Sequence, residues 1–301
     1  MSVLHSVLLS TRPKQWIKNL VVFLALMFTA NQYWSLADPS RFVNLAGRTL
    51  LAFVLFCLTT GSVYLINDVV DIKKDQEHPT KRFRPLPSGK LKVSQAIVAA
   101  VCLILVSGGF SFWLETSLGF LVMGYFLLML AYSYLLKHIV IIDVFTIAAG
   151  FMLRVVAGAA VIQVPISPWL YICTILGALF LGFTKRRHEL VLLNDDATRH
   201  RPILEQYTPG LLEQMIAVVT PSTVIAYSLY TFSAENLPKN HAMMLTIPFV
   251  LYGVFRYLYL VHTKNQGGSP EEALLRDVPL MVNIALWVLV SVLILLVFRH
   301  Q

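Results

Sequence analysis

Polar side chains that could do chemistry are concentrated in one short stretch of this 301-residue chain, directly after the apolar run at 50–66. Four oxygen-bearing residues follow one another there at steps of one, three and four: Asn67, Asp68, Asp71 and Asp75. On an α-helix these positions lie within an arc of about 100°, so the four side chains share one face. Such a face is a typical site for a hard divalent cation, and Mg²⁺ takes its remaining ligands from water and from phosphate.

Basic residues follow this acidic face directly. Pro79 is expected to end the helix. The bases after it are Lys81, Arg82, Arg84, Lys90 and Lys92. Positive charge at the end of a membrane helix is also expected from topology alone, but acidic residues contribute little to orientation, so that alternative leaves the aligned aspartates unexplained. Acids and bases together predict a site for a metal-bound diphosphate.

The composition is typical of a membrane protein. Hydrophobic residues make up 57% of the chain and charged residues 13%, and the mean hydropathy is +0.69. The net charge of +8 does not indicate a nucleic-acid partner, because the bases lie between apolar runs and no nucleic-acid-binding motif is present. Cys57, Cys102 and Cys173 lie inside apolar runs without metal-ligand spacing, so we expect them to pack in the core.

Nine apolar runs are candidates for membrane-spanning helices. They cover 16–31, 43–68, 93–114, 117–136, 139–162, 168–187, 213–233, 242–262 and 279–298. No internal repeat is visible, so a single domain over 1–301 is expected. With the N-terminus inside, the inside loops hold most of the 24 lysines and arginines, which predicts a cytoplasmic N-terminus and cytoplasmic chemistry. The first run is not followed by a cleavage site, so we expect it to stay as an anchor.

Four charged residues outside the acidic stretch have roles that the sequence leaves open. Lys14 and Lys18 are either an interfacial anchor or a pair of cations that face an anionic lipid headgroup. Asp143 and Arg154 lie at membrane depth on one helix, about 16 Å apart along its axis, so each needs a partner elsewhere. Asp143 is close enough to the cytoplasmic end to join the site, whereas Arg154 lies deeper and is either structural or functional.

The sixth apolar run ends in a basic segment. Its residues are Lys185, Arg186, Arg187, His188 and Glu189. Lys185 and Glu189 are one turn apart and can form an ion pair along the helix, but three consecutive bases beside an acid equally suit a second phosphate.

The last polar loop predicts a short helix that begins at Pro270, and the start of a helix explains Glu271 and Glu272 without a functional role. The roles of Arg276 and Asp277, at the beginning of the final run, stay open.

The acidic motif Asn-Asp-x-x-Asp-x-x-x-Asp after the second run, with Arg-Pro-Leu-Pro-Ser-Gly at 84–89, resembles the UbiA superfamily of intramembrane prenyltransferases. The resemblance covers essentially the whole chain. It implies an all-α, polytopic bundle of nine transmembrane helices in the cell (inner) membrane. It also implies a polar cavity that faces the cytoplasm, a lateral opening to lipid, and Mg²⁺-assisted release of diphosphate.

The chain departs from the aromatic prenyltransferases of that superfamily, which usually carry a second Asp-rich motif after the sixth helix. The basic segment stands there instead, and Asn194-Asp195-Asp196 does not restore the acidic spacing. Four features look like the decaprenyl-phosphate phosphoribosyltransferase branch: RPKQWIKN, HPTKRFRP, KRRHE and SPEEALLRD. That branch transfers 5-phosphoribose from phosphoribosyl diphosphate to a polyprenyl phosphate. A donor with a phosphate at each end explains why bases replace the second acidic cluster.

This resemblance divides the candidate residues among the reactants. Mg²⁺ on the donor diphosphate is assigned to Asn67, Asp68, Asp71 and Asp75, and the three aspartates are the catalytic candidates. The diphosphate is assigned to Lys81, Arg82 and Arg84. The 5-phosphate is assigned to Lys185 and Arg186, the ribose hydroxyls to Glu189, the lipid phosphate to Lys14 and Lys18, and Asp143 to the edge of the site.

Two other functions fit part of the pattern. The same fold could move a polyprenyl group from its diphosphate to an aromatic acceptor. A transporter is favoured by Asp143 and Arg154 at membrane depth, but the chain lacks the repeated halves that many transporters show, and its acids gather at one edge.

Overall fold

The computed structural model describes residues 2–193, 202–234, 236–264, 268 and 270–298, and within these ranges the chain is helical apart from its connections. The α-helices are α1 (Val3–Ser10), α2 (Leu24–Phe28), α3 (Pro39–Val70), α4 (Ile72–Glu77), α5 (Val93–Leu114), α6 (Thr116–Tyr134), α7 (Ile142–Val161), α8 (Pro168–Leu193), α10 (Pro209–Ser233), α11 (Ile247–Thr263), α12 (Pro270–Arg276) and α13 (Val278–Phe298). The 3₁₀-helices are η1 (Pro13–Phe23), η2 (Lys81–Phe83), η3 (Leu136–His138), η5 (Pro202–Gln206) and η6 (Ala242–Thr246). The predicted all-α class is confirmed.

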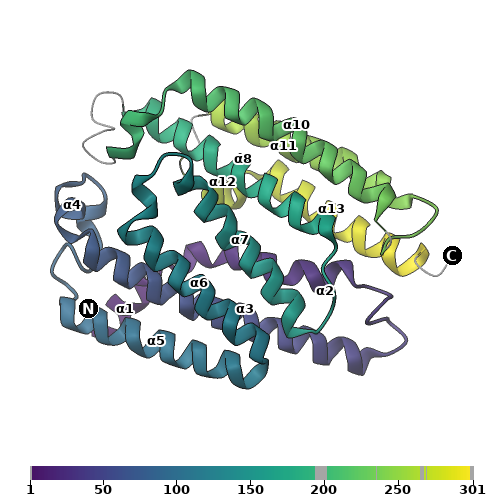
Figure 1. The fold of residues 1–301 in the computed structure, drawn as a ribbon, viewed down its shortest axis with the longest axis horizontal. Coiled ribbons are helices and arrows are strands. Elements are labelled where there is room, and N and C mark those ends of the chain that lie inside the picture. Colours follow the sequence, from purple (N-terminus) through teal and green to yellow (C-terminus); the bar gives the residue numbers. More distant parts are fainter. Residues whose placement is uncertain (1, 194–201, 235, 265–267, 269, 299–301) are drawn as a thin grey trace.

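Eight helical segments in the described part of the chain are long and apolar enough to cross a membrane. They are α3, α5, α6, α7, α8, α10, η6 joined to α11, and α13. Figure 1 shows these helices running side by side along the long axis, with the N-terminus at the end that carries α4 and the C-terminus at the other. Eight of the nine predicted spans therefore correspond to long helices.

The first predicted span, 16–31, is not one continuous α-helix. It begins as η1 and continues as the short helix α2. Because a 3₁₀-helix rises about 2 Å per residue instead of 1.5 Å, η1 and α2 together extend about 30 Å, close to the thickness of the hydrocarbon core. A ninth crossing made by this segment stays a prediction.

Close packing places η1 between α3 and α7. The backbone of Val22 in η1 passes so near Gly158 of α7 that a Cβ on this glycine would lie 2.0 Å from the Val22 carbonyl oxygen. Only a residue without a side chain allows this approach. The later part of η1, with the buried residues Asn19 and Val22, is thereby held inside the bundle.

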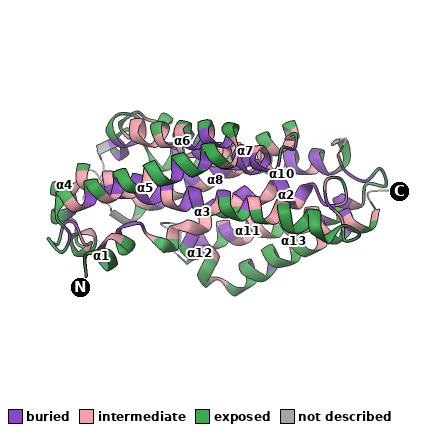
Figure 2. Ribbon diagram, turned by 90° about the horizontal axis from the view of Figure 1, so that it is seen from below, coloured by how far each residue is buried: buried purple, intermediate pink, exposed green. Residues whose placement is uncertain are grey.

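Burial follows the arrangement expected of a bundle in lipid. In Figure 2 the buried residues lie along the inner faces of the helices and the exposed residues cover the outside. Many of the exposed side chains are large and apolar, such as Leu105, Trp113, Phe120 and Leu289. An outer surface of this kind would be unstable in water and suits contact with acyl chains.

Candidate active site

A cavity of about 420 Å³ opens among α3, α4, α6, α7, α8 and η1, near the bundle end that carries α4. Seven bases line it, namely Arg12, Lys18, Lys74, Lys81, Lys137, Arg154 and Lys185. Three carboxylates line it, namely Asp71, Asp75 and Glu189. The surplus of positive charge favours an anionic ligand.

The acidic motif lies where α3 passes into α4. Helix α3 ends at Val70, and Asp71 departs only slightly from helical geometry before α4 begins. The backbone N–H of Asp71 still donates to the Asn67 carbonyl, and that of Asp75 to the Asp71 carbonyl, both at 2.9 Å. The one-face prediction is therefore close to the observed geometry, although the helix is interrupted. The chain turns extended at His78, because the residue before a proline disfavours the helical conformation.

Two of the aspartates share one arginine. Arg84 donates from Nη1 to Asp75 Oδ2 at 2.7 Å and lies 3.4 Å from Asp68 Oδ1. Arg12 forms a second ion pair with Asp68, and Lys81 lies 3.8 Å from Asp75. Asp68 and Asp75 are both buried, so these cations compensate charges that could not otherwise leave water.

Asp71 is held separately, since Lys137 Nζ lies 2.9 Å from its Oδ1. With each aspartate turned to a base, no three metal-ligating side chains among the described residues stand close enough to form a cluster. The donor set still suits a hard cation, because Asp68 Oδ2 is buried and accepts no hydrogen bond from a described residue. Asn67 lines the same cavity.

Two bases that contact the aspartates, Arg12 and Lys137, were not among the predicted site residues. Arg12 adopts a left-handed backbone conformation (φ 55°) between α1 and η1, and its guanidinium lies 4.7 Å from the centre of the Tyr64 ring. A non-glycine residue in this region is uncommon, and such strain is frequent at functional sites. Lys137 is a single base between two apolar runs, so its sequence context gave no signal.

Two predicted cations, Lys14 and Arg82, are exposed and do not line the cavity. Lys14 is exposed at the start of η1. Arg82 is exposed as well, and its guanidinium lies over the Phe83 ring. By contrast, the predicted residues Lys18, Lys81 and Lys185 all line the cavity.

Arg186 and Asp143 form a buried ion pair instead of facing the cavity. Arg186 Nε donates to Asp143 Oδ2 at 2.7 Å, and Arg186 Nη1 lies 2.8 Å from Glu189 Oε2. The Tyr207 hydroxyl donates to Asp143 Oδ1 at 2.8 Å and accepts from the backbone N–H of Ile141 at 2.7 Å. Burial raises the pKa of Tyr207, so its hydroxyl keeps its proton. Asp143 therefore has its partner, and Arg186 fixes Glu189 at the cavity wall.

Glu271 has a role that a helix start does not explain. It is buried, and its carboxylate lies 3.2 Å from Lys18 Nζ and accepts from the Gln15 amide. Burial would raise the pKa of Glu271, but Lys18, Lys185 and the Gln15 hydrogen bond outweigh it and lower the pKa. The interpretation of Glu271 from sequence was therefore incomplete, because it missed this connection between α12 and η1.

The two charged residues whose roles the sequence left open at the beginning of the final run, Arg276 and Asp277, also form ion pairs. Arg256 lies 2.8 Å from Asp277, whose carboxylate also caps α13 by accepting from the Leu280 N–H. Arg276 is exposed, 3.7 Å from Glu272. These pairs account for Arg256, Arg276 and Asp277 structurally. The segment Asn194-Asp195-Asp196 lies outside the described residues.

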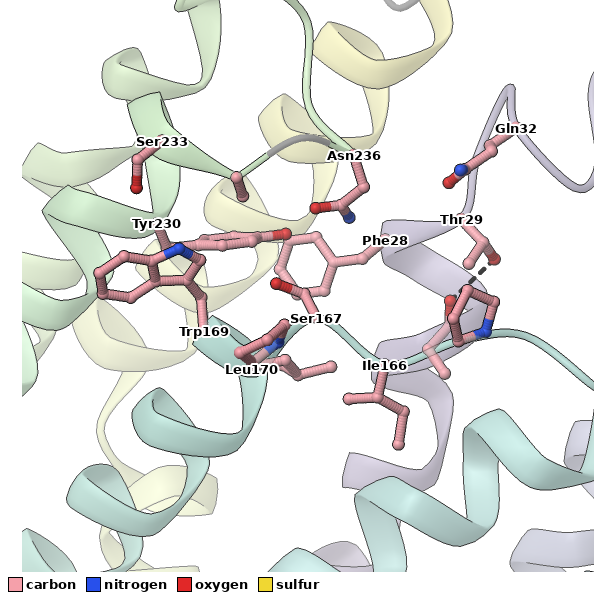
Figure 3. Close-up of a pocket in the computed structure, with 14 residues that line it drawn as sticks. Phe28, Thr29, Gln32, Ile166, Ser167, Trp169, Leu170, Tyr230, Ser233 and Asn236 are labelled. Atoms are coloured by element: carbon pink, nitrogen blue, oxygen red, sulfur yellow. Dashed lines mark hydrogen bonds between the residues drawn. The ribbon is translucent and has the colours of Figure 1, made fainter.

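A second cavity, of about 360 Å³, lies at the other end of α8. Figure 3 shows its lining of aromatic rings and amides, including Trp169, Tyr230, Phe28 and Asn236. No charged side chain is among the described residues that line it. It therefore offers nothing to neutralise a diphosphate, and the basic cavity is the candidate active site.

Known proteins are similar to this chain in both sequence and fold. The model of the UbiA prenyltransferase family matches residues 19–273. A decaprenyl-phosphate phosphoribosyltransferase from Corynebacterium glutamicum is 34% identical over 92% of this chain and 82% of its own length. The enzyme of the same name from Mycolicibacterium smegmatis is 31% identical over 93% of this chain and 89% of its own.

Solved structures agree on the fold. A UbiA homolog from Archaeoglobus fulgidus bound to GPP and Mg²⁺ superimposes with a TM-score of 0.72 at 17% identity, covering 96% of this chain and 99% of the other. The chain is thus a transferase with several membrane-spanning helices, and it belongs to the UbiA prenyltransferase family, in the branch of the decaprenyl-phosphate phosphoribosyltransferases.

Proposed function

We propose that this protein transfers 5-phosphoribose from phosphoribosyl diphosphate to a polyprenyl phosphate and releases diphosphate, with Mg²⁺ as its cofactor. The names of the relatives, which match over most of this chain, support the reaction. The distribution of lysine and arginine supports placement in the cell (inner) membrane with the N-terminus and the active site on the cytoplasmic side.

The observation that carries the proposal is the presence of two groups of bases around one acidic motif. The first group, Arg12, Lys81, Arg84 and Lys137, contacts the aspartates. The second group, Lys18, Arg154 and Lys185, lines the same cavity without contacting them. A donor with a diphosphate at one end and a phosphate at the other would use both groups. A prenyl diphosphate carries charge at one end only.

The residues that would hold Mg²⁺ are Asn67, Asp68, Asp71 and Asp75. The solved UbiA homologs with Mg²⁺ bound support a divalent cation in this fold. When bound, the ion neutralises the charge that develops on the departing diphosphate.

The bases that hold the aspartates would change partners when substrate arrives. Arg84, Lys81 and Lys137 are ion-paired with carboxylates. If those carboxylates held a cation, the same three bases could turn to diphosphate oxygens. Charge-assisted hydrogen bonds of this kind position the donor and stabilise the leaving group.

Bond making and breaking then balance without an additional reactant. The bond between ribose C1 and the diphosphate oxygen breaks, and its electron pair leaves with the diphosphate. A phosphate oxygen of the lipid forms the new bond to C1. Because this oxygen is already ionised, no strong general base is required. Glu189, fixed by Arg186 at the cavity wall, is placed to accept hydrogen bonds from the ribose hydroxyls.

A two-donor assay on purified protein tests the proposal. With Mg²⁺ and a polyprenyl phosphate, ribose-labelled phosphoribosyl diphosphate should give a labelled lipid and an equal amount of diphosphate. A labelled polyprenyl diphosphate with an aromatic acid should give no prenylated product. The opposite pattern would assign the chain to aromatic prenyl transfer, and no turnover with either pair, combined with solute flux in vesicles, would favour a transporter.

A further inference from the structure

Arg154 is a buried cation at the inner end of the active-site cavity. It lies on α7 about 18 Å from the start of that helix, and only 6% of its surface is exposed. Its Nε donates to Asn19 Oδ1 at 2.7 Å, its Nη2 to the Tyr125 hydroxyl at 2.7 Å, and its Nη1 to the Gly150 carbonyl at 2.9 Å. The guanidinium also stacks over the Tyr125 ring, with Arg154 Cζ 4.5 Å from the ring centroid.

All of these partners are neutral, which sets Arg154 apart from the other buried charges. Arg186 pairs with Asp143, and Glu271 pairs with Lys18. Arg154 forms no salt bridge with any residue of the described ranges, although its side chain is a cation. A buried, hydrogen-bonded cation without a counterion at membrane depth is unfavourable unless an anion or water reaches it.

The surroundings of Arg154 would attract an anion rather than another cation. Lys18 and Lys185 line the same cavity. Lys18 is close enough to Arg154 for their charges to repel each other, and the same holds for Lys18 and Lys185. Glu271 is ion-paired with Lys18 and, like Glu189, also interacts with Lys185. Because Arg186 already holds Asp143 and Glu189, the four bases Lys18, Arg154, Lys185 and Arg186 face three carboxylates, and a surplus of positive charge remains.

We propose that Arg154, with Lys18 and Lys185, forms a second anion subsite that binds a phosphate monoester. This inference rests on the proposed function, since both of its substrates carry such a group: the 5-phosphate of phosphoribosyl diphosphate and the phosphate of the polyprenyl lipid. The three hydrogen bonds to neutral groups fix the guanidinium in advance, so that binding an oxyanion requires little rearrangement. The subsite also explains why Arg154 lacks a carboxylate partner.

Competition binding tests the subsite. Labelled phosphoribosyl diphosphate is bound to wild type and to Arg154→Gln. It is then displaced with ribose 5-phosphate in one series and with inorganic diphosphate plus Mg²⁺ in another. In Arg154→Gln the loss of charge-assisted hydrogen bonds should raise the Kd of ribose 5-phosphate about 10- to 100-fold. The Kd of diphosphate should change by no more than about twofold, because the bases that bind it are untouched. Arg256→Gln is the matched control, an arginine in a membrane helix whose partner is Asp277, and both competitors should bind it as they bind wild type.

The two sources of phosphate give different results. If the subsite serves the lipid, Arg154→Gln leaves ribose 5-phosphate unchanged and raises the KM for polyprenyl phosphate by a similar factor. If neither ligand is affected, the subsite does not exist. Failure of wild type to bind phosphoribosyl diphosphate at all would instead refute the proposed function, and inorganic phosphate would then probe the subsite alone. Should Arg154→Gln not fold, Tyr125→Phe removes one guanidinium hydrogen bond and should weaken the same ligand a few-fold; unchanged binding there would overturn the inference.

Discussion

Replacing the buried partners Asp143 and Arg186 one at a time and together should separate a structural role from phosphate binding. Both side chains are almost fully buried, at 0% and 1% exposure. Arg186→Met removes the cation whose Nε donates to Asp143 Oδ2 at 2.7 Å and keeps the Tyr207 hydroxyl on Asp143 Oδ1. Asp143→Asn is milder, because Arg186 keeps its second carboxylate, Glu189, at 2.8 Å.

These contacts set the expected magnitudes. Removing one partner of a buried ion pair costs about 3–5 kcal/mol, so Arg186→Met should lose that much of the free energy of unfolding, and Asp143→Asn distinctly less. Combining the two changes removes both charges. The double variant should therefore be more stable than Arg186→Met by about 2–3 kcal/mol, which is a large coupling between neighbouring sites.

Titration with SDS from a mild detergent measures the unfolding free energies, and the KM for phosphoribosyl diphosphate measures donor binding. Because Arg186 faces Asp143 rather than the cavity, the folded double variant should keep a KM within about tenfold of wild type. Two results would refute this reasoning. One is a double variant no more stable than Arg186→Met. The other is a well-folded double variant that no longer binds the donor, as expected if Arg186 holds the 5-phosphate.

Three further predictions follow from the same structure. Asp71→Asn should lower kcat by at least about 100-fold. It should lose less than about 1 kcal/mol in stability, because the ion pair between Asp71 and Lys137 is partly exposed. A variant with wild-type turnover would exclude Asp71 from the metal site. Glu271 has a lowered pKa when folded, so its contribution to stability is complete above its unfolded pKa and is lost as pH falls through the folded value. The stability gap between wild type and Glu271→Gln should therefore close in acid, and a gap that stays constant from pH 7 to pH 3 would disprove the effect. Gly158→Ala should destabilise the bundle by about 1–3 kcal/mol, because the new Cβ would meet the Val22 carbonyl oxygen. Gly177→Ala is the control and should be as stable as wild type, because a Cβ there meets nothing within 4 Å. Equal stability of the two variants would show that η1 can move away from α7 at no cost.

Much of the fold was predictable because lipid imposes a simple rule on the sequence. A spanning helix must be apolar over most of its length, so the run at 93–114 corresponds to α5 and the run at 279–298 to nearly all of α13. The first span shows the limit of this rule. Hydropathy measures which side chains tolerate lipid, and it does not distinguish an α-helix from the longer rise of the 3₁₀-helix η1.

The candidate site was predictable where its residues are close in the sequence. Asn67 and the three aspartates lie within nine positions, and helical periodicity alone brings them together. The partners of these acids were not predictable in the same way. Arg12 reaches Asp68 across 56 residues and Lys137 reaches Asp71 across 66, and only the packing of η1 and α6 against α3 brings them there.

Burial also separates two residues that the sequence analysis treated alike. Lys185 and Arg186 are adjacent bases at the end of one helix, so their composition suggests equal roles. Consecutive helical residues point about 100° apart, and the two side chains consequently meet different surroundings. Lys185 lines the cavity, whereas Arg186 is enclosed with Asp143.

The most direct test of the account is an experimental structure with Mg²⁺ and phosphoribosyl diphosphate bound. We expect the diphosphate and the ion at Asp68, Asp71 and Asp75, with Arg84 and Lys137 moved from the aspartates to diphosphate oxygens, and the ribose end directed into the basic cavity. A structure in which the aspartates keep their lysine and arginine partners while the donor binds elsewhere would contradict the account.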